Sequence, residues 1–292
     1  MEAALRRGTS TIMTSCTLGE MMIASLARTI KDGTLAFHGF GSPLVQLAMH
    51  VAKRTHAPRM VMVAGATYGL DPEPPFLAPT SNDWMMDRSA SCSLGIEELF
   101  DLAAAGRMGR MFLSGLQIDQ WGNCNVTALG YPDIKLKLPG GGGGGNLSCD
   151  AAHITLWTTA HRTQKDTRNR RRYRLVKGCD FITNLGHRTR DGKPRQDLGH
   201  RGGGPEWLLT ELGLFDFDLD GHMRLKAVYP DTSTKQVLEN TEFTPSLCAE
   251  IGTIPAPDRP VVELIRKLDP LKIHEKEIRA EDMQRRFAIV WG

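Results

Sequence analysis

From Thr17 onward, hydrophobic and polar positions alternate between helical and strand spacing. The segment Thr17-Leu18-Gly19-Glu20 has the spacing of a capping box and predicts the start of a helix. Thr34 to His38 predicts a short strand, and Ser42-Pro43 predicts the start of a helix that reaches about Arg54. Met60 to Val63 is a continuous apolar run, which is typical of a strand buried on both faces of a parallel sheet. Strands and helices in this order predict an α/β fold.

Weaker patterns extend this alternation along the rest of the chain. We predict helices at 96–105, 235–239 and 261–267, and strands at 110–113, 126–129, 153–157, 181–183, 214–217 and 223–229. The prolines between Leu70 and Asp83 exclude a regular helix or a central strand there, so we predict a loop. Because we find no internal repeat and no clear linker, we expect one α/β domain.

Composition and charge are those of a soluble globular protein. The 292 residues are 41% apolar and 24% charged, with a net charge of +3, which excludes fibrous and disordered classes. No apolar run approaches the roughly 18 to 20 residues of a membrane span. Because the N-terminal residues lack the apolar region of a secretory signal, we expect a cytoplasmic protein. The scattered cysteines, without a CxxC pair, and the absence of HExxH spacing indicate neither disulfides nor a metal site.

A run of glycines after Pro139 is a candidate binding segment. It is formed by Gly140, Gly141, Gly142, Gly143, Gly144 and Gly145, followed by Asn146. Glycines without side chains let the backbone approach a ligand closely, and their amides can form an anion-binding nest or an oxyanion hole. A flexible surface loop is the alternative, because the run matches neither the P-loop nor GxGxxG.

The segment from Arg162 to Lys177 concentrates positive charge. It holds eight basic residues against one acid, Asp166, so its local charge is +7. Such a segment suits the phosphates of a nucleotide-like cofactor or of a nucleic acid, or it is a solvated loop. Because only Tyr173 interrupts the run as an aromatic residue, we do not expect nucleic acid as a partner.

Two acids follow the predicted buried strand. Asp71 and Glu73 lie in the proline-rich loop, at the carboxyl end of that strand, where open α/β sheets place ligands. They are candidate acid or base groups, and a solvated loop acid is the alternative.

Several segments resemble motifs of class I CoA-transferases, and of the B (β) chain of glutaconate CoA-transferase in particular. Gly39-Phe40-Gly41-Ser42-Pro43 resembles the family's Gly-x-Gly-x-Pro turn, and Val51-Ala52-Lys53-Arg54 is similar to its helix end. The segment from Gln117 to Asn125, which includes Asp119 and Asn123, matches Gln-Ile-Asp-x-x-Gly-Asn-x-Asn, the most specific of these motifs. The glycine run corresponds to the family's Gly-rich loop. Further similar segments recur in the same order at 229–230, 237–241, 256–258, 264–266 and 269–270.

The resemblance implies a fold, a substrate and a partner. The fold is a Rossmann-like open α/β fold, with a mostly parallel sheet and flanking helices. The substrate is an acyl thioester of coenzyme A. The partner is a separate A (α) subunit in an α2β2 complex, with the active site at the interface. Because the resemblance runs from about Thr17 to Leu271, we expect a poorly ordered leader at 1–16, a CoA-transferase-like domain at 17–272 and a tail at 273–292.

The resemblance also implies that the family's nucleophile is missing. In transferring members a glutamate attacks the acyl-CoA and then carries CoA as a glutamyl thioester. The ungapped match through 51–54 places that glutamate at Gly65, and glycine cannot form such an intermediate. CoA transfer would therefore require Asp71 or Glu73 as a replacement. The alternatives are hydrolysis of a carbon–carbon bond in a cyclic oxoacyl-CoA, as in relatives that degrade steroid rings, or a non-catalytic CoA-binding subunit.

The resemblance and the residue chemistry together give three groups of candidate site residues. The candidate acids are Asp71 and Glu73. Residues expected to bind CoA or an oxyanion are Gly39, Gly41 and the glycine run with Asn146. Residues expected to shape the site are Asp119, Asn123 and Asn125.

Overall fold

The computed structural model describes residues 15–39, 42–65 and 67–289. These residues fall into two compact units. Residues 15–33, 42–93 and 255–289 belong to the first unit, and residues 34–39 and 94–254 to the second. The predicted domain limits after residues 16 and 272 stay predictions. Ser15 and Cys16 of the predicted leader lie in a strand of the first unit.

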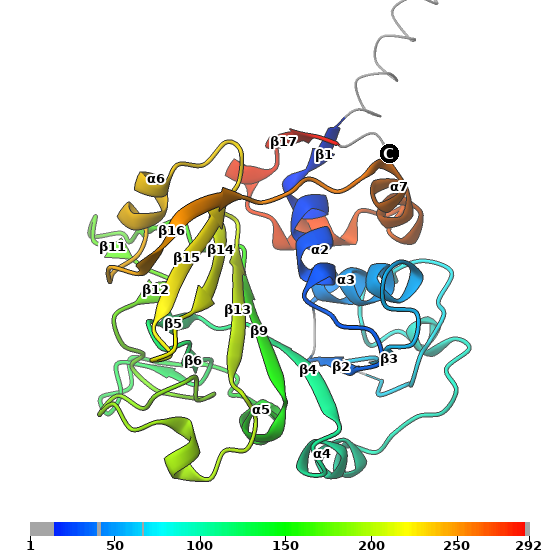
Figure 1. The fold of residues 1–292 in the computed structure, drawn as a ribbon, viewed down its shortest axis with the longest axis horizontal. Coiled ribbons are helices and arrows are strands. Elements are labelled where there is room, and N and C mark those ends of the chain that lie inside the picture. The colour runs from blue at the N-terminus through cyan, green and yellow to red at the C-terminus, as the bar shows by residue number, and fades with distance from the viewer. Residues whose placement is uncertain (1–14, 40–41, 66, 290–292) are drawn as a thin grey trace, which may run out of the picture. The chain divides into compact units, whose positions relative to one another are not determined.

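The first unit is built around packed helices. Its elements are β1 (Ser15–Thr17), α2 (Leu18–Arg28), α3 (Pro43–Arg54), β3 (Val61–Val63), α7 (Arg259–Leu268), β17 (Arg286–Ala288) and the 3₁₀ helices η1 (Trp84–Asp87), η3 (Ile273–Glu277) and η4 (Ala280–Asp282). The predicted capping box is present, because Thr17 caps α2 and Glu20 bonds back to the Thr17 N–H. Helix α2 is buried along most of its length and packs on α3 and α7 (Figure 1). Strand β1 pairs with β17, so both ends of the described chain enter this unit.

The second unit contains a mixed, mostly parallel sheet. Its strands lie in the order β16 (Ser246–Thr253), β15 (Met223–Val228), β14 (Gly213–Phe217), β13 (Pro205–Thr210), β9 (His153–Thr158), β4 (Met108–Leu113) and β2 (Leu35–His38). The pairs of β2 with β4, β4 with β9, β9 with β13 and β15 with β16 are parallel. The helices of this unit are α4 (Ile96–Ala104), α5 (Gly144–Asp150), α6 (Thr234–Glu239) and the 3₁₀ helix η2 (Arg195–Leu198). The predicted open, mostly parallel sheet with flanking helices is confirmed.

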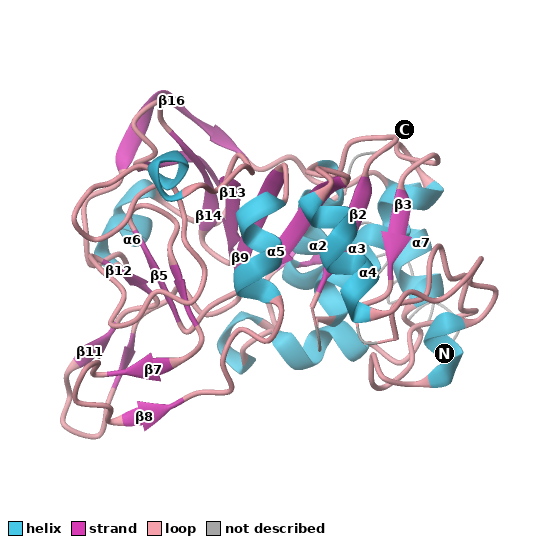
Figure 2. Ribbon diagram, turned by 90° about the horizontal axis from the view of Figure 1, so that it is seen from below, coloured by secondary structure: helices cyan, strands magenta, loops and turns pink. Residues whose placement is uncertain are grey.

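Short strands form smaller sheets in the second unit, on the side of α5 away from β2 (Figure 2). Strand β5 (Gln117–Asp119) pairs with β6 (Cys124–Asn125) and with β12 (Leu175–Val176). Strands β7 (Ala128–Leu129) and β8 (Leu136–Lys137) form one hairpin, and β10 (Gln164–Lys165) and β11 (Arg171–Arg172) form another.

Most predicted elements are confirmed to within a few residues, and the exceptions lie near the small sheets. The predicted strand at 181–183 is wrong, because Thr183 makes only isolated bonds to β6 and the residue after it: its N–H donates to the Cys124 carbonyl, and its hydroxyl accepts from the Val126 N–H. The predicted strand at 126–129 is shortened to β7, since Asn125 bonds locally to Thr127 and Ala128. No helix in the described part of the chain is long and apolar enough to cross a membrane.

Candidate functional site

The glycine segment, residues 140–146, is a defined turn that leads into α5. Gly140 and Gly142 have φ angles of 90° and 52°, a conformation that favours glycine. The Gly140 N–H donates to the Val126 carbonyl at 2.8 Å, and the Gly144 N–H donates to the Gly141 carbonyl at 2.7 Å. Gly144, Gly145 and Asn146 lie in α5, where the sequence predicted only a loop. Tertiary packing through the buried Leu147 and Ser148 overrides the low helix propensity of glycine.

Several amides of the glycine segment have no acceptor within residues 15–39, 42–65 and 67–289. Among the described residues, the free N–H groups are those of Gly141, Gly142, Gly143, Gly145 and Asn146. The first N–H groups of a helix are unsatisfied within it, and they carry partial positive charge. Clustered amides of this kind can donate to an oxygen anion. The predicted oxyanion role remains a prediction that this arrangement supports.

Close packing accounts for part of the glycine run without any ligand. A Cβ atom on Gly141 would lie 2.7 Å from Thr183 Cγ2, and one on Gly143 would lie 2.8 Å from Phe100 Cζ. On Gly145 it would meet the Thr183 carbonyl oxygen at 3.4 Å, which is an ordinary contact. The segment is therefore fitted against residues 183–184, and position 145 tolerates a small side chain.

Asp119 and Asn123, two of the residues predicted to shape the site, form a buried polar network, while the buried Asn125 bonds to Gln117 and to the Ala128 carbonyl. Asp119 Oδ1 accepts from the N–H groups of Trp121 and Asn123 at 3.0 and 3.1 Å, and its Oδ2 accepts from Asn123 Nδ2 at 2.9 Å. Asn123 also donates to the Arg188 carbonyl and accepts from the Gly186 N–H. Burial raises the pKa of Asp119, and the hydrogen bonds from Asn123 and Trp121 oppose that shift. These groups are used inside the protein and shape the surrounding loops.

The polar network connects to the glycine segment through residues 183–184. The Cys124 N–H donates to the Asn184 carbonyl, and Asn184 Nδ2 donates to the Ser148 hydroxyl at 3.3 Å. The Ser148 hydroxyl in turn donates to the Gly145 carbonyl at 2.9 Å. The structure thus joins two sets of predicted site residues that are separate in the sequence.

Arg195 is a structural residue of the site that the sequence analysis did not identify. Its side chain is 0% exposed, and Nη2 donates to the Ser148 carbonyl at 2.7 Å, at the carboxyl end of α5. Nη1 donates to the carbonyls of Leu185 and Gly186 at 3.1 and 3.0 Å. Burial lowers the pKa of Arg195. One guanidinium therefore holds α5 and the 185–186 backbone together.

Asp71 and Glu73 lie in the first unit. Asp71 Oδ1 accepts from the Met62 N–H at 2.8 Å and lies 2.9 Å from Lys53 Nζ, while the Asp71 N–H donates to the Met62 carbonyl. This carboxylate fastens the loop after β3 back onto that strand. Glu73 is exposed, and its N–H donates to the Arg88 carbonyl. Gly65 is buried, two residues after the end of β3. The acid roles of Asp71 and Glu73 remain predictions.

The predicted turn at 39–41 is described only in part, since Gly41 lies outside the described residues. Gly39 follows β2, and its carbonyl accepts from His38 Nδ1 at 2.7 Å. A carbonyl can only accept, so Nδ1 carries the proton and Nε2 carries the lone pair. His38 is 1% exposed, and burial lowers its pKa to about 4, so the ring is neutral at pH 7.

Glu277 makes the stability of the first unit depend on pH. Its Oε2 accepts from the Leu44 N–H at 2.8 Å, in the first turn of α3, and burial raises its pKa from 4.5 to about 8. A raised folded-state pKa means that this contribution to the free energy of unfolding is complete below pH 4.5 and is lost as pH rises through 8.

We therefore expect Glu277→Gln, which retains the acceptor oxygen, to flatten this decline. Urea unfolding from pH 5 to pH 9 measures it. The buried His38 makes stability rise with pH below its ordinary pKa of 6.5, which is the opposite slope. Because both proteins contain His38, the difference between their free energies of unfolding isolates the contribution of Glu277. Parallel curves for the two proteins would contradict the assignment.

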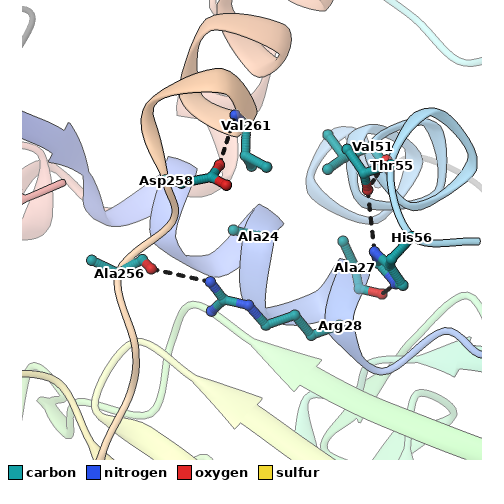
Figure 3. A pocket seen from close by; sticks show the side chains of 9 residues that line it. All are labelled: Ala24, Ala27, Arg28, Val51, Thr55, His56, Ala256, Asp258 and Val261. Carbon is teal, nitrogen blue, oxygen red and sulfur yellow. Dashed lines mark hydrogen bonds between the residues drawn. The ribbon is translucent and has the colours of Figure 1, made fainter. Parts of the chain in front are cut away.

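A cavity of about 400 Å³ in the first unit is not assigned as a ligand site (Figure 3). Its polar groups already bond to its own walls. Arg28 donates to the carbonyls of Pro255 and Ala256, His56 Nε2 bonds to the Ala27 carbonyl, and Asp258 accepts from the Val261 N–H. Among the described residues, no group of three or more His, Cys, Asp or Glu side chains is placed to hold a metal ion.

Comparisons with known proteins identify the family. No family model matches the chain. The B chain of glutaconate CoA-transferase from Acidaminococcus fermentans is 32% identical over 268 residues, 88% of this chain and 94% of that one. The B chain of 3-oxoadipate CoA-transferase from Pseudomonas knackmussii is 27% identical over 261 residues, 88% of this chain and 95% of that one.

Two further relatives carry out other reactions. The solved structure of the decarboxylase AibA/AibB has a TM-score of 0.76 and 30% identity, and it covers 90% of this chain and 98% of the matched one. The IpdB subunit of a cholesterol ring-cleaving hydrolase from Rhodococcus jostii is 25% identical over 186 residues, 62% of this chain and 67% of that one. The extent and identity of these matches show that the chain belongs to the family of CoA-transferase B subunits, which includes members with other activities.

Proposed function

We propose that this chain is the B subunit of a heteromeric enzyme that acts on an acyl-CoA thioester without forming a glutamyl-CoA intermediate. The A subunit is the proposed partner, in an α2β2 complex. The family membership supports the substrate class, and the paired names of AibA/AibB support an A subunit.

The residue at position 65 is the main support for the proposal that this enzyme does not transfer CoA. Gly65, two residues after the end of β3, stands where the motif match through Val51 to Arg54 places the nucleophilic glutamate. Covalent transfer needs a carboxylate that attacks the thioester and then holds CoA. Asp71, a candidate replacement, is engaged by the Met62 N–H and by Lys53. We therefore place the enzyme among the members that do not transfer CoA.

The free amides of the glycine segment favour a reaction that breaks a carbon–carbon bond next to the thioester. Cleavage of such a bond leaves its electron pair on the α carbon, and this carbanion is the enolate whose charge lies on the thioester oxygen. Preorganised amides lower the energy of that charge. Ring-cleaving hydrolysis, with water activated by a carboxylate of the A subunit, and decarboxylation both fit this scheme. Both kinds of enzyme occur among the relatives.

A trapping experiment on the A–B complex tests whether the nucleophile is missing. The complex is incubated with an acyl-CoA and a free carboxylic acid, treated with borohydride and examined by mass spectrometry. We expect the wild type to show no reducible thioester adduct and no CoA on the acceptor acid. Gly65→Glu is expected to gain an adduct at position 65, while Gly65→Gln, of the same size but without a nucleophile, gains none.

Two outcomes would contradict the proposal. A wild-type adduct on Asp71 or Glu73, together with CoA on the acceptor, would show that transfer is retained through another carboxylate. If the complex binds acyl-CoA but converts none of a broad set of oxoacyl and carboxyacyl thioesters, the chain would be a non-catalytic CoA-binding subunit instead.

A further inference from the structure

Residues 164–172, the basic hairpin, consist of β10, β11 and the turn between them. Asp166, the one acid between Arg162 and Lys177, builds this turn: its Oδ1 accepts from the N–H groups of Arg168 and Arg170, both at 2.9 Å. Its Oδ2 lies 2.8 Å from Arg170 Nη2. The Asp166 side chain is 6% exposed. This acid therefore neutralises Arg170 and no other cation of the hairpin.

Three other cations of the hairpin, Lys165, Arg168 and Arg172, are uncompensated, and Glu239 attracts Arg171 electrostatically. Lys165, Arg168, Arg171 and Arg172 are exposed, and none forms an ion pair with another described residue. Lys165 and Arg171 lie directly opposite each other across the ribbon. Like charges in this position destabilise a strand pair, unless an anion lies between them. Arg171 also donates to the Tyr173 hydroxyl at 3.4 Å and to the Glu239 carbonyl at 3.5 Å.

The basic hairpin is joined to the sheet that supports the glycine segment. Strand β11 leads through Tyr173 into β12, which pairs with β5, and the Ile118 N–H donates to the Arg174 carbonyl at 2.9 Å. On the other side of β5, β6 holds residues 183–184 against the glycine segment. Figure 2 shows β11, β12 and β5 on the same side of α5. The basic hairpin and the glycine segment are thus both attached to this small sheet, the hairpin through β12 and the glycine segment through residues 183–184 at β6.

We propose that the basic hairpin binds the phosphate groups of the CoA part of the substrate, an inference that rests on the proposed function. CoA carries a 3′-phosphate and a diphosphate, and the planar guanidinium of arginine matches phosphate with two parallel hydrogen bonds. Arginines outnumber lysine among the uncompensated cations of the hairpin. The hairpin lacks the interleaved aromatic residues on which single-stranded nucleic acid stacks.

Isothermal titration calorimetry of ligands binding to the A–B complex tests this assignment. The probes are CoA, 3′-dephospho-CoA and pantetheine, which lacks all phosphates. The variant Arg168→Gln/Arg171→Gln/Arg172→Gln is expected to raise the Kd for CoA about tenfold, because three exposed ion pairs with phosphate are lost, and to leave the Kd for pantetheine unchanged. Its CoA affinity also becomes less dependent on salt. The control Arg88→Gln/Arg107→Gln/Lys276→Gln removes as many charges from exposed positions outside the hairpin and is expected to bind CoA as the wild type does.

The other outcomes overturn the assignment in distinguishable ways. Equal CoA affinity of the hairpin and control variants, with pantetheine bound normally, would reject the hairpin as the phosphate site and leave the proposed function standing. Failure of the hairpin variant to assemble with the A subunit would make the hairpin a protein contact instead. A wild-type complex that binds neither CoA nor pantetheine would refute the proposed function itself.

Discussion

Replacement of Gly145 by proline is expected to lower the turnover of the A–B complex with its acyl-CoA substrate by about 100-fold, the usual effect of removing one oxyanion-hole donor. Proline has no N–H, and the first turn of a helix tolerates it because the N–H groups there have no partner within the helix. Gly145 is the second residue of α5 and its amide is free among the described residues. The substitution thus removes one donor at a position compatible with proline.

Alanine at the same position is the matched control. Gly145→Ala keeps the N–H and adds only a methyl group, 3.4 Å from the Thr183 carbonyl oxygen, so turnover should stay within a few-fold of the wild type. Gly143 is a poorer target, because a side chain there would meet Phe100 at 2.8 Å and disturb packing as well as chemistry. Equal turnover of the proline and alanine variants, with both folded by circular dichroism, would exclude the Gly145 amide from the reaction.

Arg195→Met is expected to lower the free energy of unfolding by about 3 kcal/mol, which is large for a single substitution. The guanidinium is fully buried and donates to the carbonyls of Ser148, Leu185 and Gly186. Methionine fills much of the volume but donates nothing, so these carbonyls lose their bonds inside the protein. Urea unfolding, with the slope checked against the wild type, measures the loss.

A neighbouring arginine controls for charge and size. Arg201 lies 2.9 Å from Asp150, but its side chain is 66% exposed, and Arg201→Met should cost at most about 1 kcal/mol. Arg195→Lys keeps the charge and lacks the planar fork, so we expect an intermediate loss. If Arg195→Met were no more destabilising than Arg201→Met, the hydrogen bonds from Arg195 to the backbone carbonyls would not contribute to stability.

The sequence predicted the parts of the fold that depend on local signals. The capping box at Thr17 and the Ser42-Pro43 start both begin helices in the structure, because the residues that cap a helix lie next to it in the chain. The run at Met60 to Val63 became β3 for a similar reason, since a short apolar run between turn residues has few other stable arrangements.

The elements that the sequence did not predict depend on distant partners. Helix α5 begins in glycines, which local propensity places outside helices, and it exists because Leu147 and Ser148 are buried. Arg195 belongs to a residue type that is mostly exposed, and only the fold brings the carbonyls of Ser148 and Leu185 to it. The role of the motif around Asp119 as site architecture stays a prediction, and its link to Gly145 through Asn184 and Ser148 required the structure.

The pairing of β1 with β17 sets the order in which a growing chain can complete its fold. Thr17 pairs with Arg286, so the first described strand lacks its β17 partner until the chain has been synthesised as far as residue 286. At about 5–20 residues per second, that wait is roughly 15 to 55 s. Residues 34–39 and 94–254 of the second unit are all synthesised before β17. The second unit can therefore finish during synthesis, while β1 stays without its partner strand until β17 has been made.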